Sequence, residues 1–163
     1  MKIILILTGV AVAVVLAIVA LGMAAPKDHE VSLERDYAVP AEKIYKLVRA
    51  YEDYPSWRSG VTAVTRDGDD RYIEESGHGR IPYKIVEQRP HARLVSQIDD
   101  PGLPFSGTWT FEIIDRGDAC RLRITETGSV PNPVFRFFST YMFSHEETIR
   151  VYLADLARKL GEK

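Results

Sequence analysis

Residues 105–126 have the sequence FSGTWTFEIIDRGDACRLRITE. Apolar and polar side chains alternate along 105–114, with Trp109, Phe111 and Ile113 on one face, and they alternate again along 120–124. This period of two is typical of half-buried β-strands. The two segments are separated only by the turn 115–118, and strands joined by so short a turn pair antiparallel. The stretch therefore predicts an antiparallel hairpin within a larger sheet.

Outside this hairpin, five further segments of the chain show the same alternation of apolar and polar side chains. They lie at 31–39, 61–66, 71–77, 81–88 and 94–98. Between the first and second of these, Pro40 fits the first turn of a helix over 41–50, and 51–57 forms a second, short helix or turn. We expect one strand, two short helices and then six strands in meander order.

A long apolar stripe follows the last strand. Its members recur every three or four residues, which is the spacing of one helix face; they are Phe135, Phe138, Met142, Ile149, Tyr152 or Leu153, Leu156 and Leu160. We predict one continuous helix over about 132–160. Its apolar face must be buried, and the concave face of the sheet is the only large partner for it.

This order of elements resembles the helix-grip fold of the SRPBCC, or START-like, superfamily, and in particular its polyketide cyclase/dehydrase and lipid transport group. Three stretches carry the likeness: YAVPAEKIY at 37–45, YPSW at 54–57, and GTWTFE at 107–112 with Leu122, Thr125 and Glu126. The resemblance covers about residues 29–160. It implies an α+β fold with an antiparallel sheet wrapped around the C-terminal helix. It also implies a cavity between the two that binds hydrophobic molecules, but it implies no single reaction.

The N-terminal segment lies outside this resemblance. Residues 3–25 contain no charged side chain, and 23 residues in a helix would reach roughly 34 Å, enough to span the hydrocarbon core of a bilayer. We expect a transmembrane anchor at 1–25, a linker at 26–30 and the START-like domain at 31–163. The alternative is a cleaved signal peptide, because Gly22-Met23-Ala24 has the small residues of a cleavage site. Lys2 before the segment favours a cytosolic N-terminus and a single-pass protein with an extracytoplasmic domain.

Composition excludes several classes of function. The net charge of −2, with acids and bases interspersed, provides no basic surface for nucleic acid. The single cysteine, Cys120, cannot form an intrachain disulfide, and we expect it to be a small buried apolar residue. The four histidines, His29, His78, His91 and His145, have no metal-ligand spacing along the chain. We therefore expect no metal and no cofactor.

The candidate binding residues are mostly apolar. Side chains with inward parity, or on the helical stripe, would form the wall of a cavity; they are Tyr83, Trp109, Phe111, Phe135, Phe138 and Met142. Ligand pockets are mostly apolar with a few polar groups. The alternative is that these side chains simply fill the core.

Four polar side chains could act inside such a cavity. Arg35 shares the inward parity of its strand and would need an acidic partner, Glu126 or Glu74, although a register break could leave all three solvated. His145 lies beside the apolar stripe and could orient a ligand or act as a general acid or base, which makes it the candidate catalytic residue. Alternatively, His145 is bonded at the edge of the stripe to a carboxylate or to water.

These features favour a membrane-anchored domain that binds or transfers a hydrophobic small molecule or lipid. A polyketide cyclase- or dehydratase-like enzyme is one alternative, with His145 or a carboxylate moving a proton. A scaffold that binds protein partners at the membrane is another, and it predicts an exposed apolar patch on the convex face of the sheet or on the loops.

Overall fold

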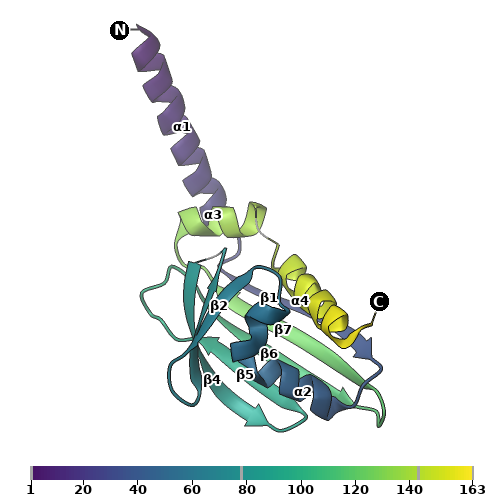
Figure 1. Cartoon of the computed structure of the whole chain (residues 1–163). Helices are drawn as coiled ribbons and strands as arrows, with labels where there is room; N and C mark the ends of the chain where they lie inside the picture. The colour runs from purple at the N-terminus through teal and green to yellow at the C-terminus, as the bar shows by residue number, and fades with distance from the viewer. Residues whose placement is uncertain (1, 78, 143, 163) are drawn as a thin grey trace.

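The strands expected from alternation form one sheet in the computed structural model of the chain (Figure 1). The structure describes residues 2–77, 79–142 and 144–162. His78, which sequence spacing excluded as a metal ligand, lies outside these ranges. One strand, two short helices and six further strands follow one another as predicted.

The sheet has seven antiparallel strands in the order β1-β7-β6-β5-β4-β3-β2. The strands are β1 (Asp28–Tyr37), β2 (Val61–Arg66), β3 (Arg71–Ser76), β4 (Gly79–Arg89), β5 (Arg93–Ile98), β6 (Ser106–Asp115) and β7 (Cys120–Ser129). The first strand in the chain pairs with the last, so β1 and β7 lie side by side at one end of the sheet. The hairpin predicted for residues 105–126 is β6–β7, paired from Asp115 with Cys120 out to Ser106 with Ser129.

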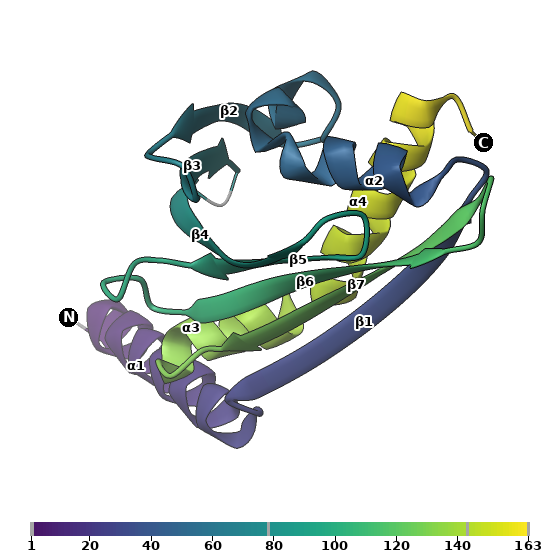
Figure 2. The same ribbon diagram turned by 90° about the horizontal axis from the view of Figure 1, so that it is seen from below.

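Helices cover the concave face of this sheet (Figure 2). They are α2 (Ala41–Arg49), the short 3-10 helix η1 (Tyr51–Ser56) and α4 (His145–Leu160). The amphipathic faces of these helices form the core with the inward residues of the strands: Ile44 and Val48 from α2 and Ile149 and Leu156 from α4 are almost completely buried. The sequence period of each element therefore predicts which of its residues lie inside.

The C-terminal helix is not continuous, and our prediction of one helix over 132–160 is wrong. The chain forms α3 (Pro133–Tyr141) and then a separate helix, α4, which begins at His145. Each helix has its own N-cap: the Asn132 side chain accepts from the backbone N–H groups at Val134 and Phe135, and Ser144 Oγ accepts from that of Glu147 at 3.2 Å. The Asn132 cap would serve a continuous helix as well, but the Ser144 cap satisfies an N–H group that a continuous helix would bond internally. Only α4 lies against the sheet, and α3 lies across the base of the N-terminal helix (Figure 1).

The N-terminal helix α1 (Lys2–Ala24) projects away from the sheet. It is long and apolar enough to cross a membrane, a property that a signal sequence shares. Near its C-terminal end Gly22 packs so closely on α3 that an added Cβ would lie 1.8 Å from the Pro133 carbonyl oxygen. Since β1 begins at Asp28, residues 28–30 belong to the sheet rather than to the linker we expected, and Ala25, Pro26 and Lys27 connect α1 to β1.

Candidate functional site

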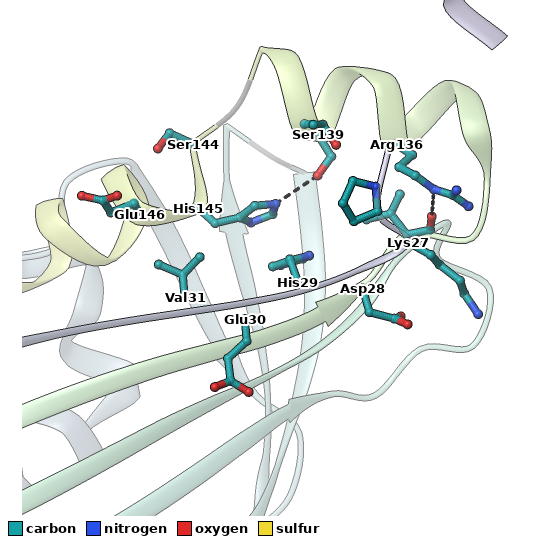
Figure 3. A pocket seen from close by; sticks show the side chains of 13 residues that line it. Lys27, Asp28, His29, Glu30, Val31, Arg136, Ser139, Ser144, His145 and Glu146 are labelled. Carbon is teal, nitrogen blue, oxygen red and sulfur yellow. Dashed lines mark hydrogen bonds between the residues drawn. The ribbon is translucent and has the colours of Figure 1, made fainter. Parts of the chain in front are cut away.

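A pocket lies between α3, the start of β1 and the start of α4 (Figure 3). Its volume is about 430 Å³, within the range of small-molecule sites. The lining residues come from these three elements and their connections: Pro26, Lys27, Asp28, His29, Glu30, Val31, Val130, Arg136, Ser139, Thr140, Ser144, His145 and Glu146. Because Pro26 and Lys27 belong to the short connection between α1 and β1, the pocket lies at the end of the domain where the N-terminal helix enters.

Two histidines and a glutamate meet at the inner side of this pocket. His145 Nδ1 lies 3.4 Å from Glu126 Oε1, and His29 Nε2 lies 3.8 Å from the same oxygen. The two imidazole rings are stacked, with their centroids 3.7 Å apart and their planes 21° from parallel. All three side chains are between 16% and 27% exposed, so the cluster is largely shielded but reachable from the pocket.

The register of β1 on β7 explains this meeting. Val31 lies opposite Glu126, and His29 lies opposite Gly128. Since Gly128 has no side chain, the His29 ring can lie over its backbone: an added Cβ would be 2.4 Å from His29 Cε1. From there His29 reaches diagonally to Glu126, a neighbour on the same face of the sheet.

Electrostatics favours the neutral form of one of the two stacked imidazoles. Burial, followed by the charge of His145, lowers the pKa of His29 below its usual value, and this outweighs the opposite effect of Glu126 and Asp28. A neutral imidazole retains an unprotonated ring nitrogen that can accept a proton or bind a metal.

Two further side chains fix the roof of the pocket. Ser139 on α3 makes a 3.1 Å hydrogen bond with His145 Nε2, which ties the two helices together across the break (Figure 3). Arg136 donates to the carbonyl oxygens of Val130 at 2.9 Å, Pro131 at 2.7 Å and Ala25 at 3.3 Å. Arg136 thus links α3, the end of β7 and the end of α1.

The space between α4 and the middle of the sheet is occupied by aromatic side chains. The Tyr152 ring of α4 lies 5.5 Å from Phe111, 5.4 Å from Trp57 and 6.2 Å from Trp109, measured between ring centroids. These are the separations of packed aromatic pairs. The cavity that the resemblance implied between sheet and C-terminal helix is thus filled at this level, and the pocket described above lies further along, beneath α3.

A buried ion pair completes this interior. Arg58 Nη1 donates to Glu74 Oε2 at 2.5 Å, and the Arg58 guanidinium lies over the Tyr54 and Tyr152 rings, 4.7 and 4.8 Å from their centroids. Burial raises the pKa of Tyr54 well above its usual value, so its phenol remains neutral. These groups stabilise one another.

The structure brings some of the predicted site residues together. Glu126 and His145 are in contact at the pocket, and Trp109 is paired with Glu126 across β6 and β7. Phe111 is buried against Tyr152, and Tyr83 stacks on the Tyr72 ring at 5.2 Å. Trp109 is thus a strand neighbour of Glu126 but packs on Phe111 and Tyr152, and Phe111 and Tyr83 belong to the core.

Arg35 lies apart from both carboxylates proposed for it. Arg35 is paired with Leu122, four residues along β1 from the position opposite Glu126, or about 13 Å at the rise of a strand. Glu126 contacts the two histidines and Glu74 bonds Arg58 instead. Arg35 itself lies over the Tyr37 ring, 5.7 Å from its centroid.

The helix break also moves three predicted wall residues. Phe135, Phe138 and Met142 do not continue the stripe that α4 buries, because they belong to α3 or its C-cap. Their exposed fractions are 50%, 37% and 66%. Together with Val134 and Tyr141 they give α3 an exposed apolar surface beside α1.

Sequence reasoning missed His29, Ser139 and Arg58. The parity of β1 would have indicated His29, which shares odd numbering with Val31 and Leu33, but we expected the strand to begin at residue 31. Spacing along the chain likewise revealed no metal-ligand pattern, because His29, Glu126 and His145 come from distant segments. No local sequence signal identifies Ser139 or Arg58, whose partners depend on tertiary packing.

Solved structures share this fold. A START superfamily protein from Mycobacterium smegmatis is 19% identical, with a TM-score of 0.59 over 81% of this chain and 94% of that one. Norcoclaurine synthase from Thalictrum flavum, solved with dopamine and hydroxybenzaldehyde, is 12% identical, with a TM-score of 0.63 over 86% and 90% of the two chains.

The di-domain ARO/CYC BexL of the BE-7585A biosynthetic pathway is 16% identical, with a TM-score of 0.64 over 82% of this chain and 46% of that chain. At these identities the likeness shows the fold alone. No match was found among curated protein sequences.

The family model for polyketide cyclase/dehydrase and lipid transport proteins matches residues 28–161. This range includes the whole sheet, the helices α2, η1, α3 and α4, and all three residues of the histidine–glutamate cluster. The α+β helix-grip fold with seven antiparallel strands agrees with that match, as the resemblance implied. The chain therefore belongs to the polyketide cyclase/dehydrase and lipid transport family.

Proposed function

We propose that the chain is a membrane-anchored domain that binds a hydrophobic small molecule or lipid in the pocket beneath α3. The observation that carries this proposal is the position of the pocket. It is lined by Pro26 and Lys27, the residues that join α1 to the sheet, and by α3, whose apolar surface lies beside α1. A ligand that partitions into lipid meets the domain at this end first.

Membrane anchoring is part of the proposal, and the packing of α1 on α3 supports it. Gly22 allows the Pro133 backbone to approach α1, and Arg136 bonds the Ala25 carbonyl. Cleavage after Ala24 would remove Gly22 and the rest of α1, and so the surface on which Pro133 packs, although Ala25 and its carbonyl would remain. A retained helix explains the close packing of Gly22 on Pro133, whereas a cleaved signal peptide leaves that contact without a role.

The exposed surface of α3 fits an interfacial helix. Phe135, Phe138 and Tyr141 are aromatic, and aromatic side chains are enriched where a bilayer meets water. A helix that lies across the base of a membrane-spanning helix can bury such a face in the headgroup region. The pocket beneath α3 would then open next to the acyl chains.

The chemistry of the pocket suits an amphiphile. Val31 and Val130 contribute apolar surface, whereas His29, His145 and Ser139 contribute polar atoms on the inner side. Such a combination orients the polar part of a ligand and leaves its apolar part toward the membrane. Proteins of this family are described as cyclases, dehydrases and lipid transport proteins, which agrees with a hydrophobic cargo.

A second candidate is an enzyme that transfers a proton to or from a ligand in the same pocket. The contact of His145 with Glu126 favours it, because a carboxylate can orient an imidazole for general acid–base catalysis. Conversion of a bound polyketide-like substrate by the wild type but not by His145→Asn would establish the activity; equal rates would exclude His145 as the catalytic residue.

The scaffold alternative has less support. Among the described residues outside α1 and the α3 segment, the exposed large apolar side chains are Val86, Ile114 and Val151, on β4, β6 and α4. Single apolar residues on separate elements are normal on a soluble surface and form no contiguous patch.

Native mass spectrometry of the full chain, purified from membranes, tests the proposal. We expect a bound apolar molecule that organic extraction can recover and identify. Thr140→Trp places an indole at the pocket wall and should reduce occupancy severalfold, whereas Lys159→Trp, at the far end of α4, should leave it unchanged. Folded wild-type protein without a bound apolar mass, or equal occupancy in both variants, would contradict the proposal.

A further inference from the structure

The cluster at the inner side of the pocket contains a set of groups that bind metal ions. His29 comes from β1, Glu126 from β7 and His145 from α4, and one ligand atom from each lies within 4.8 Å of the others. Two imidazole nitrogens and one carboxylate form a ligand set found in catalytic zinc sites, where water takes a further position. The three residues come from elements that are far apart in sequence, so only the folded chain brings these ligand atoms together.

Two atoms of this cluster lack the hydrogen bonds that buried polar atoms usually have. His29 Nε2 and Glu126 Oε2 are inaccessible to solvent, and neither has a hydrogen-bond partner among the described residues. Buried polar atoms without partners are rare in native proteins and call for an explanation, such as a bound ion. A cation between His29 and Glu126 would satisfy both atoms.

The surroundings of His145 also resemble those of a metal ligand. Its Nδ1 faces Glu126, and its Nε2 is hydrogen-bonded to Ser139 Oγ at 3.1 Å. Metal-binding histidines usually have the second ring nitrogen hydrogen-bonded, because that bond fixes the tautomer and orients the ring. With Nε2 protonated and bonded to Ser139, the Nδ1 lone pair is directed toward Glu126.

The charges near the cluster favour a cation. Glu126 contributes a carboxylate within the cluster, and Asp28 precedes His29 in the pocket lining, whereas Glu30 points away from the cluster (Figure 3) and Glu146 is paired with Arg150. Of the two cationic side chains in the lining, Arg136 is bonded to backbone carbonyls on the roof.

We propose that His29 Nε2, His145 Nδ1 and the Glu126 carboxylate bind one Zn²⁺ ion at the inner side of the pocket. The separation of 3.4 Å between His145 Nδ1 and Glu126 Oε1 is close to that of two ligands on one tetrahedral zinc, about 3.3 Å for metal–ligand bonds near 2.0 Å. His29 is 3.8 Å from that oxygen, and its ring must rotate out of the stack for its lone pair to reach the same ion. Both histidines line the pocket, so pocket water completes the coordination.

Zinc titration of the full chain in detergent, after removal of metals by a chelator, tests this site. Calorimetry should show one Zn²⁺ per chain. Glu126→Gln and His145→Asn should each weaken binding at least tenfold, and Ser139→Ala, which removes only the hydrogen bond to a ligand, should weaken it about tenfold.

His91→Asn is the matched control. His91 lies between β4 and β5 with a φ of 63°, which asparagine tolerates, and its ring contacts Tyr45 rather than the pocket. Zinc binding by this variant should equal that of the wild type.

A second measurement uses only the wild-type chain, so it tests the site even if the substituted variants fail to fold. Co²⁺ added to the metal-free wild type should produce the visible absorption of a four- or five-coordinate site, and one equivalent of Zn²⁺ should abolish it. The absence of stoichiometric Zn²⁺ binding to folded wild type, or binding that His145→Asn and Glu126→Gln leave unchanged, would overturn the proposal. Because the probe is the metal alone, failure here would leave the hydrophobic-ligand proposal standing, and absence of an apolar ligand would leave this one standing.

Discussion

At the scale of single residues, the site depends on a position that has no side chain. Gly128 lies opposite His29 in the β1–β7 pair, and its missing Cβ makes room for the imidazole. Parity along β7 predicts that Glu126 faces inward, as the structure shows, but parity does not reveal which neighbour a side chain contacts. The register between β1 and β7 determines which side chains are neighbours. That register depends on the hydrophobic pattern of the whole sheet rather than on any short stretch of sequence.

Gly128→Ala tests this dependence. The added methyl group would lie 2.4 Å from His29 Cε1, so the ring must move. We expect zinc affinity to fall at least tenfold and stability to fall by about 1–3 kcal/mol, the typical cost of overpacking. Calorimetry and urea unfolding measure the two effects. Gly77→Ala, where nothing lies within 4 Å of the added atom, is the control and should change neither quantity substantially.

The only cysteine offers a second test at this scale. Cys120 is 1% exposed, as expected for a small buried apolar residue, and burial raises its pKa to about 11. The native thiol therefore remains protonated at pH 8, and only the thiolate reacts rapidly with alkylating reagents. Iodoacetamide at that pH should leave the folded protein unmodified and label it fully in denaturant. Rapid labelling of the native protein would show that Cys120 is accessible.

At the scale of elements, the strands could be predicted from the sequence and the helix break could not be predicted from apolar spacing. The stripe from Phe135 to Leu160 continues through the break, so periodicity alone favours one helix. The missed signal is Ser144 followed three residues later by Glu147, which is the pattern of an N-terminal capping box. Recognition of that cap would have separated α3 from α4 and removed Phe135, Phe138 and Met142 from the predicted cavity wall.

Ser144→Ala removes the hydroxyl that caps α4. We expect the free energy of unfolding to fall by about 1 kcal/mol, which is typical for loss of a serine cap. Chemical denaturation of the full chain in detergent measures this change. Lys159→Ala, an exposed change in the last turn of the same helix, should stay within about 0.5 kcal/mol of the wild type. Equal effects of the two substitutions would mean that α4 does not depend on its cap.

At the scale of the whole molecule, the structure separates a packed interior from a pocket near the N-terminal helix α1. Aromatic rings and the Arg58–Glu74 pair occupy the space between α4 and the middle of the sheet. The family resemblance predicted a cavity at that level because a resemblance indicates the fold. It does not indicate whether individual side chains are large enough to fill the space. The pocket beneath α3 exists because the C-terminal segment forms two helices, α3 and α4, instead of one. The order of strands and helices in the family does not predict that break.

Arg58→Met tests the structural role of the interior. The substitution leaves Glu74 buried without its cationic partner, and loss of one member of a buried pair costs about 3–5 kcal/mol. The double variant Arg58→Met/Glu74→Leu should recover most of that loss in urea unfolding. Ligand occupancy of the folded fraction should be unchanged in both variants. A large fall in occupancy at constant stability would instead assign the ion pair to ligand binding.

The location of the bound ligand tests the account most directly. The measurement is NMR of methyl groups in the full chain, with a short-chain phospholipid added below its micelle-forming concentration. The account predicts shifts at Val31 and Val130, which line the pocket beneath α3, no shifts at Leu156 and Ile124 in the core, and loss of the response in Thr140→Trp. Shifts at Leu156 and Ile124 without any at Val31 and Val130 would place the ligand between α4 and the sheet and contradict the account.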